Sequence, residues 1–131
     1  MAKTLISFGH GYSAAALARR LFPLGWTIFG TTRSPDRART IREAGVTPLL
    51  LDGTDPPVEL SPALATATHL LISAGPDAQG DPTLRQFRDQ LTAAPHLQWV
   101  GYLSTTGVYG DHQGGWVDET TPLTPSTTRG K

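Results

Sequence analysis

The stretch Gly9-His10-Gly11-Tyr12-Ser13-Ala14 decides the fold of this chain. It follows a short apolar run at 5–8, which is typical of a buried strand, and it precedes a segment rich in Ala, Leu and Arg at 14–24, which is typical of a helix. A glycine-rich turn between a strand and a helix is the setting of a dinucleotide-binding turn. There the first glycine permits a tight turn, the second lets a diphosphate approach the backbone, and the third small residue lets the helix pack close to the strand.

Five of these six residues are expected to contact the diphosphate. The first turn of a helix has free N–H groups and a partial positive charge, and both favour a bound phosphate. We therefore expect a nucleotide cofactor to contact Gly9, Gly11, Tyr12, Ser13 and Ala14.

Outward from this turn, strand-like and helix-like segments alternate along the chain. The expected strands lie at 5–8, 26–30, 46–51, 69–73 and 98–104, and the expected helices at 14–24, 34–44, 58–67 and 81–93. Two helices are expected to begin at a polar cap followed by proline, Ser34-Pro35 and Asp81-Pro82. Such alternation predicts an α/β fold with a doubly wound parallel sheet, the Rossmann arrangement, with five strands in the order 3-2-1-4-5. Trp26 and Trp99 fall in expected strands and are predicted to be core residues.

Length and composition limit the alternatives. The 131 residues suffice for one domain, with a nucleotide-binding part at 1–110 and a Gly-, Thr- and Pro-rich tail at 111–131. Eleven basic residues balance eleven acidic ones, so we expect neither a nucleic acid nor a membrane as partner. There is no cysteine and no apolar run long enough to span a membrane, which favours a cytoplasmic protein. The four histidines are far apart in the chain, so no metal site is expected.

The end of the second expected strand favours NADP over NAD. An NAD site usually has Asp or Glu at this point to bind the ribose 2′-hydroxyl, whereas this chain has Thr32-Arg33-Ser34. The Arg33 guanidinium can pair with a 2′-phosphate, and the Thr32 and Ser34 hydroxyls can donate to it. The alternative is that Arg33 is a solvated loop residue.

Two further strand ends are expected at the cofactor. Asp52-Gly53 follows the third strand, where a carboxylate can accept from the adenine amino group, although an Asx turn would explain the same pair. Ser73-Ala74-Gly75 follows the fourth strand, where small residues let the backbone lie against a ribose, or simply form a turn.

The glycine-rich turn and the segment Ser104-Thr105-Thr106-Gly107-Val108-Tyr109-Gly110 together resemble the extended and atypical short-chain dehydrogenase/reductases, including the NAD-dependent epimerase/dehydratase group. The stretch Asp118-Glu119-Thr120-Thr121-Pro122, followed by Pro125, is similar to the next segment of that group. The resemblance implies an NAD(P)-dependent oxidoreductase or epimerase in which Thr105 polarises the substrate oxygen. It also implies that the chain ends before the family's C-terminal half.

The chain departs from this family at the catalytic tyrosine. Alignment on Pro125 places Arg129 at the tyrosine position, and alignment on Lys131 as the catalytic lysine places Thr127 there. Arginine stays protonated and cannot act as an acid or base near neutral pH. Three hypotheses follow: the NADP-binding half of a short-chain oxidoreductase or epimerase-like protein, a non-catalytic dinucleotide-binding or sensing module, and a domain for another nucleotide-like ligand such as S-adenosylmethionine. The small-molecule substrate is not indicated, and self-association is expected if apolar surface stays uncovered.

Overall fold

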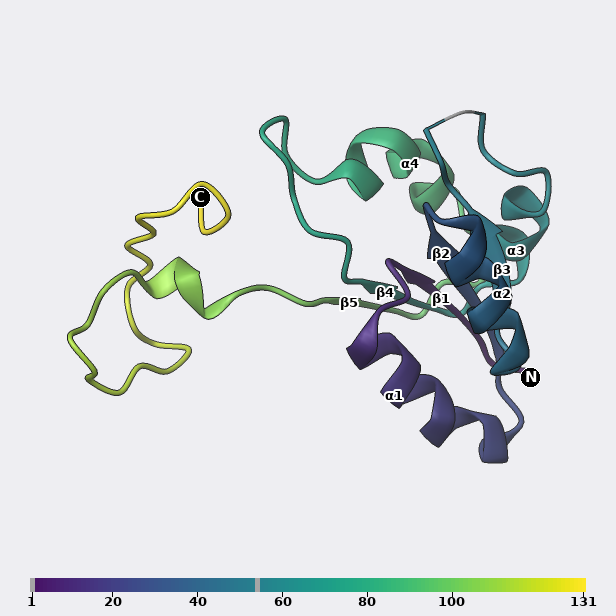
Figure 1. Cartoon of the computed structure of the whole chain (residues 1–131), viewed down its shortest axis with the longest axis horizontal. Coiled ribbons are helices and arrows are strands. Elements are labelled where there is room, and N and C mark those ends of the chain that lie inside the picture. The colour runs from purple at the N-terminus through teal and green to yellow at the C-terminus, as the bar shows by residue number, and fades with distance from the viewer. Residues whose placement is uncertain (1, 54) are drawn as a thin grey trace.

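The computed structural model describes residues 2–53 and 55–131, and its main feature is a five-stranded parallel sheet (Figure 1). The strand order is β3-β2-β1-β4-β5, as the sequence predicted. The strands are β1 (Thr4–Phe8), β2 (Thr27–Thr32), β3 (Thr47–Leu50), β4 (His69–Ile72) and β5 (Trp99–Tyr102). The helices are α1 (Tyr12–Leu21), α2 (Pro35–Glu43), α3 (Leu60–Thr66) and α4 (Pro82–Thr92). The fold is therefore Rossmann-like.

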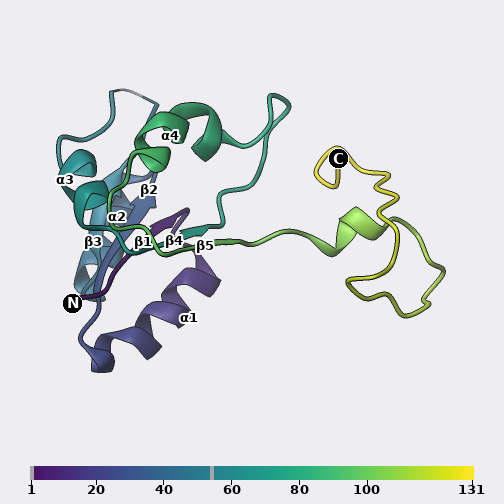
Figure 2. The ribbon, with the colours of Figure 1, turned by 180° about the vertical axis from the view of Figure 1, so that it is seen from behind.

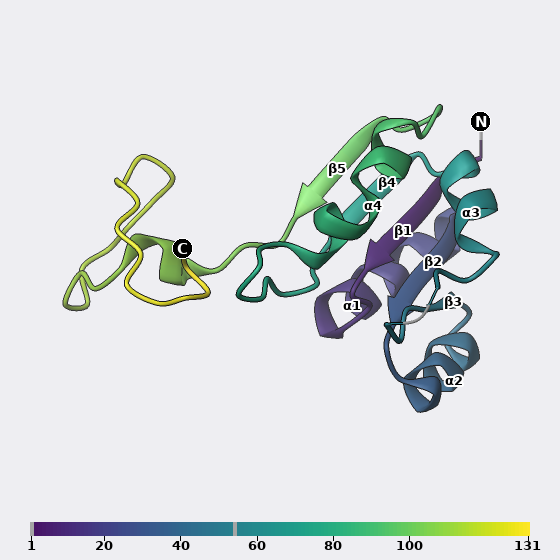
Figure 3. The same cartoon turned by 90° about the horizontal axis from the view of Figure 1, so that it is seen from above.

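Side chains of the central strand alternate between two hydrophobic cores. Leu5 belongs to a core beneath α1 and α2, with members that include Ala18 and Ile41. Ile6 and Phe8 belong to a core beneath α3 and α4. Figure 3 shows these helix pairs on opposite faces of the sheet. Because both faces are covered, every residue of β1 is buried, which explains its apolar sequence.

The starts of two helices follow the predicted capping chemistry. The Ser34 hydroxyl accepts a hydrogen bond from the Arg37 amide at 3.3 Å, and a carboxylate oxygen of Asp81 accepts one from the Leu84 amide at 3.0 Å. A proline follows each cap, where its missing N–H costs nothing. Helix α1 differs, because its cap is Gly11 and no side chain caps it.

Some element boundaries differ from the sequence predictions. Helix α1 begins at Tyr12 rather than at 14 and ends at Leu21, where a 3₁₀ turn, η1 (Phe22–Leu24), takes over. The prediction that Trp99 is a core residue is wrong, because its side chain is 46% exposed. Its strand, β5, is the last in the sheet, so Trp99 has a neighbouring strand on one side alone.

Beyond β5 the chain leaves the sheet. Figures 1 and 2 show this part, coloured from green to yellow, projecting away from the strands. It contains a short 3₁₀ helix, η2 (Thr106–Tyr109), and it folds on itself. The Thr124 hydroxyl donates to the Tyr109 carbonyl at 2.6 Å, for example. Within residues 2–53 and 55–131, no helix combines the length and the apolar character that crossing a membrane requires.

Candidate functional site

A cavity of about 550 Å³ opens where β1, β2 and β4 end. This is the edge of a doubly wound sheet at which ligands bind, and the volume falls within the range of small-molecule sites. Seven of the residues predicted from the sequence line it: Gly9, Gly11, Thr32, Arg33, Ser73, Ala74 and Gly75. The lining is completed by Phe8, His10, Thr31, Arg37, Leu51, Pro76, Asp77, Pro82, Thr83, Gln86 and Phe87.

The turn between β1 and α1, formed by Gly9, His10 and Gly11 and called the glycine turn below, is held from both sides. Gly9 has a φ of +85°, and a Cβ built on it would lie 2.7 Å from the Ala74 backbone nitrogen. Both the conformation and the lack of space require glycine here. On the β2 side, the Gly9 amide donates to the Thr31 hydroxyl at 2.7 Å. On the β4 side, the Ser73 hydroxyl donates to the Gly9 carbonyl at 2.6 Å.

Gly11 faces open space. A Cβ built on it would meet no heavy atom within 4 Å among the described residues. Its φ of −97° is ordinary extended backbone, so glycine is not required there by conformation. The first turn of α1 has neither an acidic residue nor a side-chain cap. The N-terminus of α1 therefore has no carboxylate of its own that would compete with a bound anion.

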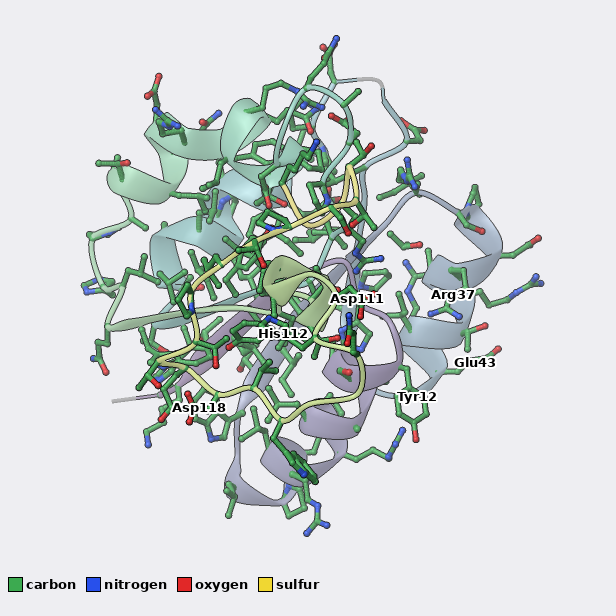
Figure 4. The ribbon with its side chains drawn as sticks, turned by 90° about the vertical axis from the view of Figure 1, so that its left-hand side faces the viewer. Tyr12, Arg37, Glu43, Asp111, His112 and Asp118 are labelled. Carbon is green, nitrogen blue, oxygen red and sulfur yellow. The ribbon has the colours of Figure 1, made fainter. Side chains whose placement is uncertain are left out.

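The remaining predicted residues of this helix have different positions. Tyr12 is 90% exposed at the start of α1, and Figure 4 shows it on the same side of the molecule as Arg37. Ala14 is 1% exposed and packs into the core beneath α1 and α2, as expected of the small residue in such a turn. Tyr12, Ser13 and Ala14 are not among the residues that line the cavity, so their predicted contacts with the nucleotide stay predictions.

His10 is the buried member of the glycine turn. Its side chain is 6% exposed, and its Nδ1 shares a hydrogen bond of 2.6 Å with the Ser7 hydroxyl. The ring occupies the space above Gly30, where an added Cβ would lie 2.6 Å from His10 Cγ. Burial, and secondarily the positive charge of Arg37, lowers the pKa of His10 below its usual value of 6.5. The ring is therefore neutral near pH 7 and works as a packing and hydrogen-bonding group.

Two cations lie at the β2 side of the cavity. Arg33 lies in the connection between β2 and α2, and Arg37 lies in the first turn of α2. The Arg37 guanidinium donates to the carbonyl of His10 at 3.2 Å. Asp36, the carboxylate between them in sequence, instead pairs with Arg39 at 3.0 Å. Ser34 does not line the cavity, and it caps α2 as described above.

No sequence pattern predicted a role for Arg37. A spacing of four residues places side chains on the same face of a helix, and Arg37 stands four residues after Arg33. This spacing was the available sequence signal for Arg37. Arg33 precedes the helix, however, so the helical spacing rule does not apply directly to this pair. The contact with His10 comes from the packing of α2 beside the glycine turn, which no local pattern specifies.

The predicted adenine contact is not tested by this geometry. Asp52 and Gly53 follow β3, but neither lines the cavity, whereas the preceding residue Leu51 does. Gly53 has a φ of +95°, which favours glycine in this turn. The proposed contact of Asp52 with an adenine amino group stays a prediction.

Thr105 is not brought to the cavity. It caps η2, and its hydroxyl accepts a hydrogen bond from the Gly107 amide at 3.1 Å. The end of the chain packs against this turn, because a Cβ built on Gly130 would lie 2.8 Å from the Gly107 carbonyl oxygen. The motif at 104–110 and the chain segment around Gly130 thus lie together. The catalytic role of Thr105 stays a prediction.

Asp111 and His112 are neighbours on the loop that follows η2, but each is hydrogen-bonded to another residue. Asp111 accepts from the Gln113 amide at 2.7 Å, and His112 Nε2 lies 2.9 Å from the Tyr109 carbonyl oxygen. Figure 4 shows both on the exposed loop. This arrangement is that of a solvated turn.

Comparison with known proteins supports the fold. No family model matches the chain, and no curated protein matches it. A conserved protein of unknown function from Silicibacter pomeroyi DSS is 55% identical over 98% of the chain, with a TM-score of 0.84. The chain spans 44% of the length of that protein.

More distant structures share the same fold. A short-chain dehydrogenase/reductase superfamily protein from Agrobacterium tumefaciens, solved with bound NAD, is 20% identical over 97% of this chain and 40% of its own, with a TM-score of 0.65. A presumed epimerase from Burkholderia cenocepacia J2315 is 19% identical over 98% of this chain and 46% of its own, also with a TM-score of 0.65. The predicted resemblance to this superfamily is thus confirmed for the fold.

Proposed function

We propose that this chain is an NADP-binding domain of the short-chain dehydrogenase/reductase type, and that residues 1–110 form the nucleotide-binding part. The observation that supports this most strongly is the glycine turn, with an uncapped helix N-terminus and an open Gly11 at a cavity of about 550 Å³. A diphosphate is the ligand that such a turn favours. The residues present therefore fit a dinucleotide.

The preference for NADP rests on charge. Arg33 and Arg37 both line the cavity, and the acidic residue that NAD-specific sites usually have after the second strand is missing. A 2′-phosphate carries close to two negative charges near neutral pH, so guanidinium groups at this position favour it over a hydroxyl. S-adenosylmethionine has no ribose phosphate for these arginines to bind.

The experiment is a binding titration of the chain with NADPH, NADH and S-adenosylmethionine, comparing wild type with Arg33→Ala. We expect NADPH to bind at least tenfold more tightly than NADH, on the basis of about 1.5–3 kcal/mol for a hydrogen bond to a charged group. Arg33→Ala should remove most of that difference while leaving NADH affinity nearly unchanged. Equal losses for both nucleotides would contradict phosphate recognition by Arg33, and tighter binding of S-adenosylmethionine would contradict the proposed cofactor.

For the role of the bound nucleotide we propose an oxidoreductase or epimerase-like reaction, in which the nicotinamide supplies or accepts a hydride. Thr105 would then orient the substrate oxygen. A second candidate is a nucleotide-binding module without chemistry, and Arg129 at the position of the family's tyrosine favours it. NADPH oxidation by a longer relative with arginine at this position, tested with carbonyl substrates, distinguishes the two functions. Turnover abolished by Thr105→Ala supports the first, and tight binding without turnover supports the second.

A further inference from the structure

The hydrogen bond between Arg37 and His10 joins two parts of the site that bind different parts of a dinucleotide. The guanidinium belongs to α2, beside the position proposed for the ribose phosphate, and the carbonyl belongs to the glycine turn, which would bind the diphosphate. The bond is 3.2 Å long and crosses 27 positions of sequence. A side chain that contacts both positions can link them.

His10 leaves the glycine turn little freedom, because it is attached at three points. Its ring bonds Ser7 at 2.6 Å, its amide donates to the Thr31 carbonyl at 3.0 Å, and its carbonyl accepts from Arg37. The first two contacts lie on the strands beneath the turn. Arg37 is the contact from the helix layer, and its substitution would free the carbonyl that precedes Gly11.

Arg37 also has donors to spare. A guanidinium has five N–H donors in a fixed plane, and one of its nitrogens, Nη2, is used by the His10 carbonyl. The ion pairs among residues 2–53 and 55–131 are Arg39 with Asp36 and Arg85 with Asp77, so neither occupies Arg37. The remaining edge of the guanidinium can bind an anion in the cavity that Arg37 lines.

We propose that Arg37 is a second specificity-determining residue, which binds the ribose 2′-phosphate together with Arg33 and simultaneously holds the His10 carbonyl of the diphosphate-binding turn. This inference rests on the proposed function. It assigns the two arginines different roles: Arg33 recognises the phosphate alone, whereas Arg37 recognises the phosphate and positions the turn. Variants of Arg33 and of Arg37 should therefore differ in their affinity for NADH, which has the diphosphate but lacks the 2′-phosphate.

The experiment measures the binding of three probes to the whole chain: NADPH, NADH and adenosine 2′-monophosphate, which has the ribose phosphate without the diphosphate. The variants are Arg33→Ala, Arg37→Ala and Arg37→Lys. Arg39→Ala is the matched control, because Arg39 lies on the same helix, is exposed and does not line the cavity. It removes one positive charge from α2 without touching the site.

We expect Arg33→Ala to weaken the binding of NADPH and of adenosine 2′-monophosphate about tenfold or more. NADH affinity should stay within about twofold of wild type. Arg37→Ala should weaken all three probes, with NADH losing about five- to tenfold because the turn is less well held. Arg37→Lys keeps the charge but not the planar fork, so it should recover part of the affinity for adenosine 2′-monophosphate. Arg39→Ala should change none of the three by more than about twofold.

The outcomes separate this inference from the proposed function. If the wild type binds neither NADPH nor NADH, the proposed function fails, and this inference fails with it. If NADPH binds but Arg37→Ala leaves NADH affinity unchanged, the link to the turn is wrong while NADP binding stands. Losses from Arg39→Ala as large as those from Arg37→Ala would mean that net charge, not contact, explains the effect. Thermal unfolding of each variant checks that it is folded, and Arg37→Lys decides if Arg37→Ala does not fold.

Discussion

At the scale of single residues, Gly11 and Gly30 lack a side chain for opposite reasons. The space beside Gly30 is occupied by the protein itself, because His10 Cγ would lie 2.6 Å from an added Cβ. Gly11 is open toward the cavity, and its φ of −97° suits any residue. Packing thus requires glycine at position 30, whereas under the proposed function the approach of a diphosphate requires it at position 11.

We therefore predict that Gly30→Ala mainly reduces stability and Gly11→Val mainly reduces nucleotide binding. Overpacking of a buried site costs about 1–3 kcal/mol, so urea unfolding should show a loss of this size for Gly30→Ala. Gly11→Val should unfold within about 1 kcal/mol of wild type, because valine adopts extended backbone readily, yet it should bind neither NADPH nor NADH. Unchanged affinity in Gly11→Val would contradict the diphosphate position proposed for this turn.

The residues of the site differ in how far the sequence could predict them. Gly9 and Gly11 belong to a short motif whose residue spacing is set by the local backbone geometry of the turn. The sequence alone therefore predicted their position at the cavity. The contact between Arg37 and His10 depends on how α2 packs beside the glycine turn. It spans 27 positions of sequence, so no local pattern predicted a role for either residue. The role of Thr105 was assigned by resemblance alone; Thr105 is not part of the cavity lining, and its role stays a prediction.

At the scale of elements, the connection between β1 and α1 contains the buried imidazole of His10, whose protonated form is disfavoured. Burial and the charge of Arg37 lower the pKa of His10 in the folded protein, whereas the unfolded chain titrates near the ordinary value of 6.5. Between these two values the unfolded chain binds a proton that the native protein does not. Stability therefore falls as the pH drops through about 6.5 toward the lower folded pKa, and it is fully kept above that range.

We predict a lower free energy of unfolding at about pH 5.5 than at about pH 7.5, and a smaller difference in His10→Asn. The variant removes the titrating ring and keeps a polar group near Ser7. His69, whose pKa burial and Lys3 also lower, contributes in the same direction, so His69→Asn is the matched comparison. Titration of the His10 ring by NMR provides a check on the wild type, and a pKa at or above 6.5 would contradict the prediction.

The elements also show which features of the fold sequence patterns predict and which they do not. Alternating strands and helices, polar caps and following prolines predicted the βαβ frame and the strand order, because each rests on local chemistry or on crossover handedness. The burial of β5 was predicted wrongly for Trp99, since a strand rich in aromatic and β-branched residues has the same sequence whether it is central or at an edge. The burial of β5 side chains depends on which elements pack beside the strand, and the sequence of the strand itself does not specify them.

At the scale of the whole molecule, the cavity and the exposed apolar side chains of β5 lie in different places. The cavity is built on the ends of β1, β2 and β4, whereas β5 is the last strand of the sheet, with one edge unpaired. Trp99, Val100 and Tyr102 of β5 are between 46% and 52% exposed. An open edge with apolar side chains is a surface on which a second chain can add a strand.

We predict that the chain self-associates through β5, with an apparent mass that rises with concentration in sedimentation equilibrium between about 5 and 200 μM. Val100→Lys should shift the chain to monomer, because a lysine on an edge strand places a charge where the second strand would pack. Val58→Lys is the matched control, since Val58 is 85% exposed and lies outside the strands, so it should associate like wild type. NADPH affinity should be the same in all three, because β5 contributes no residue to the cavity lining. A wild-type chain that stays monomeric over this range would contradict the prediction, and association that persists in Val100→Lys would place the contact elsewhere.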